Sequence, residues 1–426
     1  MGLKRWLLVV FAGELLIAFA GSLVLRALYR EVAPEGPGAN PLLWLLTLSF
    51  LPLVLRPIVL LGAGAAIFLF GLWRLLAVIL EPFGQREEPL VELIYRERSL
   101  ARGPRIVAIG GGTGLSTLLR GLKEWSRNIT AVVNVADDGG SSGKLRAELG
   151  IAPMGDIRRC LAALADSEAV MTRLLQYRFP DEGEGGLGGH AFGNLLIAAL
   201  TASEGDFEEG VRRSNEVLAV RGQVVPASPL PLTLHARLAS GEELVGQSLI
   251  ARARGVERVW VTPERAPAAR EAIDAIAEAD IIVLGPGSLY TSLLPSLLLP
   301  EIRSALASAG GTRVFVCNVA TQVGETEGYT LYDHLMALER HGVSDVIDAV
   351  LANDNFGARA PEGYPAAPVR LDLPADAPGI PQLVLTDLVD ESDAHHHDPE
   401  KLAAAVVALT GEAPPRREPT AAARSA

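Results

Sequence analysis

The segment RIVAIGGGTGLSTLLRGLKEWSRNITAVVNVADDGG, from Arg105 to Gly140, decides the fold class. Its first apolar run, 106–109, enters the glycine-rich turn Gly110–Gly114, and leucines at helical spacing follow. This order predicts a buried strand, a tight turn and a helix start, where backbone N–H groups and the helix dipole can hold a phosphate. A second apolar run, 129–135, ends in two aspartates and another glycine turn. Loops at the carboxyl ends of neighbouring strands share one crevice, so we expect a phosphate-bearing, nucleotide-like ligand there.

The glycine turn alone is a weak signal. Leu115 stands where the dinucleotide fingerprint needs its third glycine, and Asp138 and Leu145 break a P-loop pattern around Gly143-Lys144. The sequence therefore disfavours an ordinary NAD-binding oxidoreductase and a P-loop ATPase. A strand-to-helix turn that holds no ligand stays open as the alternative.

Longer blocks carry a more specific signal. In chain order they are GGGTGLSTLLRGLK, NVADDGGSSGKLR, GDIRRCLAALAD, QYRF, GHAFGNLLIAALT, GPGSLYTSLLP and CNVATQVGETEGY. Together they resemble the gluconeogenesis-factor family (YvcK type), which is related to the 2-phospho-L-lactate transferases (CofD type). The resemblance covers residues 104–355 and continues more weakly to about 410.

The resemblance implies a Rossmann-like α/β fold and, as in the regulatory members, binding of a nucleotide-sugar such as UDP-N-acetylglucosamine. It also implies a role in cell shape and carbon-source adaptation. The transferase relatives imply a guanosine-diphosphate-activated phospholactate donor, a deazaflavin acceptor and Mg²⁺. We favour a regulatory UDP-sugar-binding protein, keep the Mg²⁺-dependent transferase as the alternative, and leave open whether any reaction is catalysed.

Adjacent carboxylates, Asp137 and Asp138, are the candidate metal ligands, because paired aspartates at a strand end can hold Mg²⁺ on a diphosphate. The alternative is that one of them caps the following glycine turn. Asp156 is either a ligand contact or the N-cap of the next helix, and Ser142 has the same two readings. Arg158 or Arg159 can fork onto a phosphate.

Polar residues at other predicted strand and helix ends complete the candidate site. A helix N-terminus follows His190, and a Gly-Pro-Gly loop follows the strand 281–284. His190 as a general base is a weaker hypothesis, and we expect His395-His396-His397 to lie in a solvated loop. The candidate ligand-binding residues are Gly110, Gly111, Gly112, Thr113, Gly114, Ser141, Ser142, Asp156, Arg158, Asn194, Gly285, Gly287, Ser288, Asn318, Thr321 and Gln322.

Composition narrows the class of partner. A formal net charge of −12 and the lack of a basic patch with interleaved aromatics argue against a nucleic-acid binder. The two cysteines, Cys160 and Cys317, sit in apolar runs and predict buried free thiols rather than a disulfide or zinc site. The oligomeric state is open, a homo-oligomer included.

The first 85 residues predict a membrane anchor, with apolar stretches at about 6–26 and 58–80. Basic residues at both ends predict a transmembrane hairpin in the cytoplasmic membrane with the main domain in the cytoplasm. A secretory signal peptide is the alternative for the first stretch.

Beyond the anchor we expect a charged linker, 86–103, with a short helix over 89–100. The nucleotide-sugar-binding domain is expected at 104–410, with a disordered Pro-, Ala- and Arg-rich tail at 411–426. Within the domain, apolar alternation at 223–225, 232–238 and 243–249 predicts a small antiparallel excursion next to a helical block. The strand–helix rhythm is expected to resume at 256–262.

Overall fold

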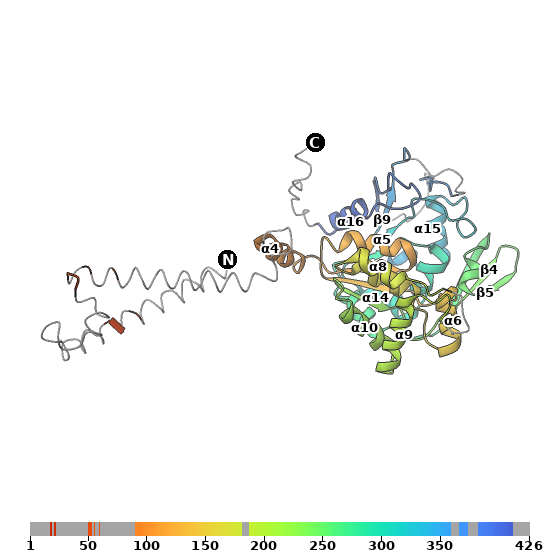
Figure 1. Cartoon of the computed structure of the whole chain (residues 1–426). Helices are drawn as coiled ribbons and strands as arrows, with labels where there is room; N and C mark the ends of the chain where they lie inside the picture. The colour runs from red at the N-terminus through yellow and green to blue at the C-terminus, as the bar shows by residue number, and fades with distance from the viewer. Residues whose placement is uncertain are drawn as a thin grey trace. The chain divides into compact units, whose positions relative to one another are not determined.

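The computed structural model describes residues 90–180, 187–358, 366–373 and 382–411, with short pieces at 18, 21–22, 50–52, 55 and 59. The chain divides into two compact units, Met1–Glu92 and Leu93–Ala426. The elements labelled in Figure 1 lie in the second unit, apart from the start of α4 (Leu90–Leu100). Helix α4 matches the short helix expected in the linker.

The membrane expectation needs correction. The expected spans, 6–26 and 58–80, fall almost wholly outside the described residues, as does the expected tail beyond Gly411. No helix among the described residues has the length and apolar character to cross a bilayer. The longest of them, α9 (Phe192–Glu204), has 13 residues, whereas a span needs about 20. This finding overturns the multi-pass membrane location.

The centre of the second unit is a parallel sheet of seven strands in the order β10-β9-β8-β7-β1-β2-β3. The chain builds outward from β1 to β3 on one side, then returns to the other side of β1 with β7 and continues to β10. Every residue of β1, β2, β7 and β9 is buried. The strands are β1 (Ile106–Gly110), β2 (Ile129–Val133), β3 (Gln223–Pro226), β7 (Ile281–Leu284), β8 (Thr312–Val316), β9 (Ala349–Asn353) and β10 (Gln382–Thr386).

This strand order confirms the expected mostly parallel α/β sheet. It also places the reversal of strand order between β1 and β7, where open α/β sheets bind ligands. The glycine turn after β1 and the Gly-Pro-Gly turn after β7 therefore flank one crevice.

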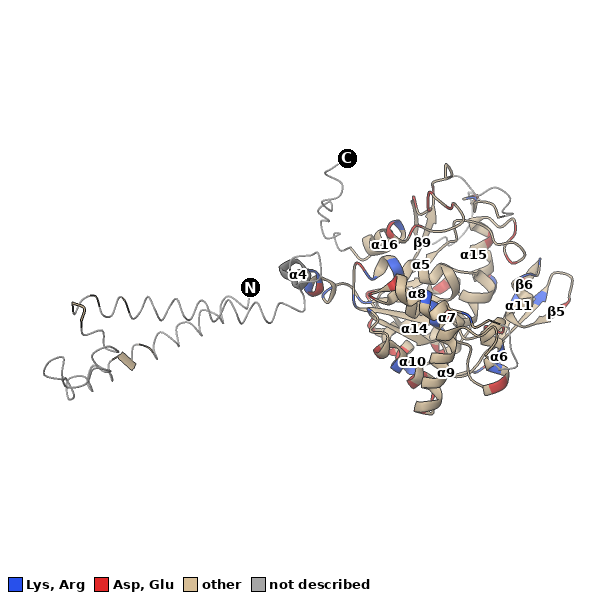
Figure 2. Cartoon of the chain, in the orientation of Figure 1, with Lys and Arg blue, Asp and Glu red and all other residues tan. Residues whose placement is uncertain are grey.

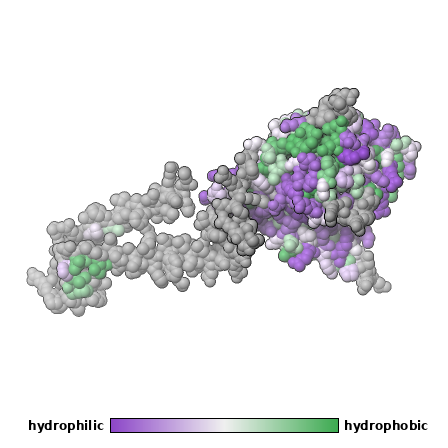
Figure 3. Space-filling view, turned by 90° about the horizontal axis from the view of Figure 1, so that it is seen from above, coloured by the Kyte–Doolittle hydropathy of each residue, from purple (hydrophilic) through white to green (hydrophobic). Residues whose placement is uncertain are grey.

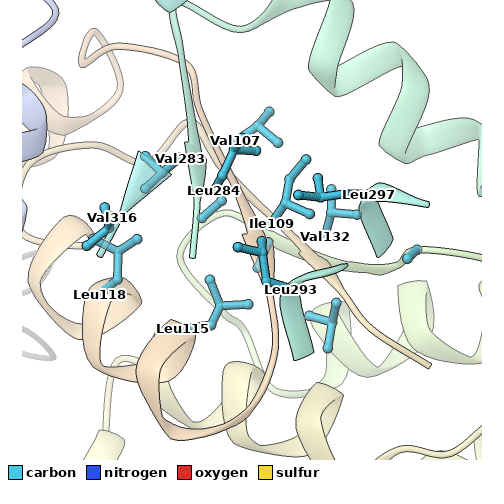
Figure 4. Close-up of a cluster of buried hydrophobic side chains, with 14 of the residues drawn as sticks. Val107, Ile109, Leu115, Leu118, Val132, Val283, Leu284, Leu293, Leu297 and Val316 are labelled. Atoms are coloured by element: carbon cyan, nitrogen blue, oxygen red, sulfur yellow. The ribbon is translucent and has the colours of Figure 1, made fainter. Parts of the chain in front are cut away.

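Helices cover the sheet because their apolar stripes pack on its buried faces. Figure 4 shows Leu115 and Leu118 of α5 in one buried cluster with Ile109 of β1, Val316 of β8 and Leu293. The helices before the arm are α5 (Gly112–Leu122), α6 (Gly140–Leu149), α7 (Gly155–Leu164), α8 (Glu168–Gln176), α9 and α10 (Phe207–Val217). Those after it are α12 (Arg270–Glu278), the π-helical turn η2 (Leu289–Leu293), α13 (Leu294–Leu297), α14 (Pro300–Ser308), α15 (Leu331–Arg340), the 3₁₀ turn η3 (Ser344–Val346) and α16 (Pro399–Ala408).

A small antiparallel sheet, β5-β4-β6, forms an arm at one edge of the unit (Figure 1). It consists of β4 (Thr233–Leu238), β5 (Glu243–Val245) and β6 (Val256–Thr262), with the one-turn helix α11 (Gln247–Ile250) between the last two. The expected excursion is thus present, but its membership differs. Strand β3 pairs in parallel with β2, and three of its four residues are buried in succession, whereas β6 pairs antiparallel with β4 in the arm and alternates from Val259 onward.

On the face seen in Figure 3, hydrophilic residues cover much of the coloured surface, and hydrophobic residues gather in one patch toward the upper right. Both cysteines are buried and free, as expected.

Candidate functional site

The two glycine turns touch through their backbones. A Cβ added at Gly114 would lie 2.6 Å from the Pro286 carbonyl oxygen and 2.9 Å from the Gly287 nitrogen. Gly112 has φ +67°, a conformation that side chains other than glycine rarely adopt. Together these turns form a surface built from Gly111, Gly112, Gly114 and Gly287, which we call the main-chain floor.

A cavity of about 260 Å³ opens above this floor. Its walls come from α5, the turn after β7, the segment after β8 and the segment before α16. Among the predicted ligand residues it includes both glycine turns and the three polar residues after β8. Its lining is Gly111, Gly112, Thr113, Gly114, Thr117, Gly287, Ser288, Ser292, Asn318, Val319, Ala320, Thr321, Gln322, Ala366, His395, His396 and His397. Of the predicted residues in the two glycine turns, Gly110 and Gly285 lie outside this lining, since Gly110 closes β1 and Gly285 precedes Pro286; Ser141, Ser142, Asp156, Arg158 and Asn194 also lie outside it.

The amides after β8 hold the second turn in place. Asn318 Nδ2 donates to the Gly287 carbonyl at 2.9 Å, and Asn318 Oδ1 accepts from the Gly287 N–H at 3.2 Å. Gln322 Oε1 accepts from Ser288 Oγ at 2.6 Å. The Asn318 amide is therefore committed to the backbone, while the Gln322 Nε2 group has no partner among the described residues and can donate into the cavity.

A buried carboxylate, Glu325, to which the sequence analysis gave no role of its own, anchors the start of η2. Glu325 is 1% exposed and accepts from the backbone N–H groups of Tyr290 and Thr291, at 2.5 and 3.0 Å, and from Thr291 Oγ1 at 2.9 Å. Burial raises the pKa of Glu325 to about 7, against the lowering effect of these donors. Glu325 thereby joins the loop after β8 to the loop after β7.

The histidine triplet lies at the cavity rather than in a purely solvated loop. His395 and His396 both contact Asp393, with Nδ1 to carboxylate distances of 3.3 and 2.8 Å. His397 is buried against the Cys317 carbonyl, and burial lowers its pKa to about 4. Consecutive histidines cannot share one face of an element, but an irregular loop lets all three line the same wall.

A second group of predicted residues is buried on the other side of the glycine turn. A Cβ at Gly111 would lie 2.5 Å from Asp156 Oδ2, and the Gly112 N–H donates to the Asp156 carboxylate. Arg159 forms an ion pair with Asp156 at 2.8 Å. Asp156 is therefore not the N-cap of α7, a position that Met154 occupies; it supports the turn from inside the first helical turn.

Among the described residues of this region, two buried polar atoms lack hydrogen-bond partners. Arg158, 5% exposed, lies with its aliphatic stem against Gly193 at the start of α9, and its Nε has no hydrogen-bond partner. The Oδ1 atom of Asn194, 1% exposed, is likewise unsatisfied. Burial, with the neighbouring Arg159 and Arg178, lowers the pKa of Arg158 to about 10. Such atoms are costly in a folded protein, which indicates that a water or a ligand atom completes them.

Ser141 and Ser142, in the loop after β2, differ in how many hydrogen bonds their hydroxyl groups already form. Ser141 Oγ accepts from the Ala191 N–H at 3.2 Å and from Asn194 Nδ2 at 3.1 Å, and contacts His190 Nδ1 at 3.3 Å. These three contacts use the whole hydrogen-bonding capacity of a hydroxyl. Ser142 has one long contact, 3.4 Å from Asn194 Nδ2. It is not an N-cap, because α6 begins at Gly140 after Gly139.

The side chains of the predicted acidic pair, Asp137 and Asp138, contact different parts of the structure. Asp138 Oδ1 accepts from the N–H and hydroxyl of Ser248 in the arm, at 2.9 and 2.7 Å. Asp137 caps the turn through the Gly139 N–H at 2.9 Å, and its Oδ2 faces Gly155 beside Ser142 Oγ. The charge of Asp137 helps to raise the pKa of Asp156, after the larger effect of burial.

The oxygen atoms of Asp137, Asp156 and Ser142 fit the ligand preferences of Mg²⁺ in part. Carboxylate and hydroxyl oxygens are its preferred ligands, and two like charges that repel one another are stabilised by a cation between them. Among the described residues no group of three His, Cys, Asp or Glu side chains forms a ready metal cage. Mg²⁺ with few protein ligands and a phosphate partner agrees with both observations.

Comparison with known proteins gives a consistent result. The family model for 2-phospho-L-lactate transferase CofD matches residues 106–383. A Nostoc sp. protein named "Putative gluconeogenesis factor" is 44% identical over 97% of this chain and 91% of its own length. The gluconeogenesis factor of Bacillus subtilis is 44% identical over 74% of this chain and all of its own length. A crystal structure from Bacillus halodurans matches with TM-score 0.67 at 42% identity, covering 72% of this chain and 100% of that one.

Proposed function

This chain belongs to the gluconeogenesis-factor family and carries its CofD-type domain, and from that membership we propose that it is a regulatory protein that binds a UDP-sugar. The nucleotide-sugar occupies the cavity above the main-chain floor, with its diphosphate on the glycine turns. Its occupancy reports on carbon supply and adjusts cell shape and carbon-source use accordingly. The relatives' name supports the link to carbon metabolism.

The main-chain floor is the observation that carries this proposal. The glycine turn at the start of α5 and the turn after β7 meet at the reversal of strand order, where open α/β sheets bind ligands. The N–H groups of Gly112 and Gly287 already donate to Asp156 and Asn318, so the remaining backbone donors of the two turns would hold the diphosphate. The walls supply groups of a different kind. Thr321, the free amide of Gln322 and His396 offer hydrogen bonds to hydroxyls and carbonyls of a sugar or a base.

Magnesium is part of the proposal. Asp137, with Asp156 as its neighbour, would hold the ion, and the ion would neutralise the diphosphate when bound. Arg158 and Ser142 lie on the same side of the glycine turn and would add hydrogen bonds to the phosphate. There, Arg158 Nε and Asn194 Oδ1 have no hydrogen-bond partner among the described residues. Asp138 contributes instead to holding the arm through Ser248.

Calorimetric titration of the full chain tests the ligand. We expect saturable binding of UDP-N-acetylglucosamine, strengthened by Mg²⁺, and weaker binding of GDP and NAD. Gln322→Leu removes a donor at the rim and should weaken binding without lowering the melting temperature, whereas Gln382→Leu, on exposed β10 outside the cavity, is the matched control. Equal affinity for all three nucleotides, or none for UDP-N-acetylglucosamine, would overturn the UDP-sugar assignment.

A second candidate function is transfer of a phosphate-linked group from a nucleoside-diphosphate donor. The match to the CofD model and the Asp137–Asp156 neighbourhood favour it. The regulatory function ranks first because the full-length relatives carry the gluconeogenesis-factor name. Phosphorus NMR of bound UDP-N-acetylglucosamine with Mg²⁺ separates the two: an unchanged diphosphate over hours is expected, and appearance of UDP or UMP would favour the transferase.

A further inference from the structure

A second cavity, of about 450 Å³, lies where the arm meets the helices that follow β7. Strand β6 contributes Arg258 and Trp260, α14 contributes Arg303, and the end of α15 contributes Arg340 and His341. The cavity shares no lining residue with the one above the main-chain floor. We call it the arginine cavity. Figure 2 shows basic residues on β6 next to α11.

The three arginines of this cavity have no carboxylate within ion-pair distance among the described residues. Arg303 donates to the Gly342 carbonyl at 2.6 Å, and Arg340 donates weakly to the Tyr290 hydroxyl at 3.4 Å. The lining contains one acidic side chain, the exposed Glu264. By contrast, Arg237 on the neighbouring strand is paired with Glu243 at 2.9 Å. The arginine cavity therefore carries an excess of positive charge in a chain whose net charge is −12.

His341 adds no charge to the cavity. Its Nε2 accepts from the Val259 N–H at 2.9 Å, so its Nδ1, 2.7 Å from the Ala337 carbonyl, must carry the proton and donate. Burial lowers the pKa of His341, and the charges of Arg340 and Arg258 lower it further. The ring is therefore neutral and fixed between β6 and α15. The cavity's positive charge comes from its guanidinium groups alone.

We propose that the arginine cavity is a second anion site, which binds the phosphate group of a small molecule. Guanidinium groups from three separate elements match the oxygens of a phosphate, since each presents N–H donors in a planar fork. The volume suits a small organic phosphate. Trp260, half-buried and stacked on His235 with ring centroids 5.4 Å apart, gives the organic part an apolar surface. The site is separate from the cavity proposed for the nucleotide-sugar, because the two share no lining residue.

Trp260 provides a local test, because it lines the arginine cavity and not the other one. Inorganic phosphate is titrated into the full chain while tryptophan fluorescence is recorded, with chloride at equal ionic strength as the salt control. We expect a saturable change with phosphate, none with chloride, and none with phosphate in Trp260→Phe. Arg258→Gln and Arg303→Gln should each weaken phosphate binding about tenfold, the scale of one charged hydrogen bond.

Arg270→Gln is the matched control, since Arg270 lies on α12 outside both cavities. It should leave the phosphate response unchanged. Arg258→Gln and Arg303→Gln should also retain binding of UDP-N-acetylglucosamine, so that loss of this site is distinguishable from failure of the proposed nucleotide-sugar function. A phosphate response that is absent from the parent chain, matched by chloride, or preserved in both arginine variants would overturn the proposal.

Discussion

The side-chain amide of Asn318 holds the backbone of Gly287 at both of its polar groups, donating to the carbonyl at 2.9 Å and accepting from the N–H at 3.2 Å. A backbone amide fixed in this way by a side chain 31 residues away ties the loop after β8 to the loop after β7. The shape of the main-chain floor therefore depends on a residue that does not need to touch the ligand through its side chain.

We call the two hydrogen bonds between Asn318 and Gly287 the clamp, and Asn318→Asp tests it. The second carboxylate oxygen would face the Gly287 carbonyl, so repulsion replaces a hydrogen bond and stability should fall by about 1–3 kcal/mol. Asn318→Ala loses both bonds without adding repulsion and should cost less. Urea unfolding at pH 8 gives the comparison, and UDP-N-acetylglucosamine affinity should fall in the same order. An aspartate variant as stable as the parent would show that the clamp has no energetic weight.

Gly114→Ala tests the contact between the two turns. The new Cβ would lie 2.6 Å from the Pro286 carbonyl oxygen, so the backbones must separate. We expect a loss of about 1–3 kcal/mol of stability, typical of overpacking, and a strong loss of nucleotide-sugar affinity. Gly310→Ala is the control, because a Cβ there meets nothing within 4 Å. Thermal unfolding and calorimetry measure the two effects, and full affinity in Gly114→Ala would argue against a shared floor.

Glu325 should make stability depend on pH. Its pKa is about 7 in the folded protein and 4.5 as the ordinary value, so the folded state holds the proton more tightly than the unfolded state. Stability from this group is therefore fully present below pH 4.5, falls as pH rises to about 7, and then levels off. The fall amounts to roughly 3 kcal/mol, at about 1.4 kcal/mol per pKa unit.

Glu325→Gln isolates that contribution. The amide keeps an acceptor for Tyr290 and Thr291 and does not ionise, so the decline in stability between pH 4.5 and 7 should become shallower. Urea midpoints at half-unit pH intervals measure the slope. Parallel curves for the parent and the variant would show that Glu325 does not titrate in this range.

Asp137 and Asp138 should respond differently to amidation. Asp137→Asn removes the charge that faces Asp156, so Mg²⁺ should no longer strengthen nucleotide binding, a loss of about tenfold. Asp138→Asn keeps an acceptor for Ser248 and should leave the Mg²⁺ effect intact. Titrations with and without Mg²⁺ measure both. If the Asp138 variant loses the Mg²⁺ effect and the Asp137 variant keeps it, the assignment of the ion is reversed.

The parts of the fold that the sequence predicted are those encoded locally. Arg105–Gly140 specifies a strand, a turn and a helix within neighbouring residues, and these appear as β1, α5 and β2. Strands β9 and β10 and helices α15 and α16 were missed because their short apolar runs lie between irregular, polar segments. The prediction assigned β3 and β6 each to the wrong sheet, because sheet membership depends on which faces tertiary packing covers.

In the candidate site, too, the sequence predicted what is encoded locally and missed what depends on tertiary packing. Both glycine turns were identified from the local sequence pattern of an apolar run followed by glycines, and the structure brings them into contact. The neighbourhood of Asp137 and Asp156 requires α7 to pack behind the glycine turn, which no local pattern encodes. Glu325 gave one signal that could have been used: it is the carboxylate that directly follows the uncharged block CNVATQVG, close to the end of a buried strand. Its partners lie 34 and 35 residues earlier in the chain.

The contact of Gly114 with Pro286 limits how ligand specificity can change as the protein evolves. A surface of peptide groups has no side chain to replace, so selection cannot adjust it by ordinary substitution without forcing the turns apart. Changes in specificity are therefore expected at residues that line the cavity with side chains, among them Thr117, Thr321, Gln322 and His396. Anyone redesigning this protein for a new ligand would randomise those four positions and keep the glycines.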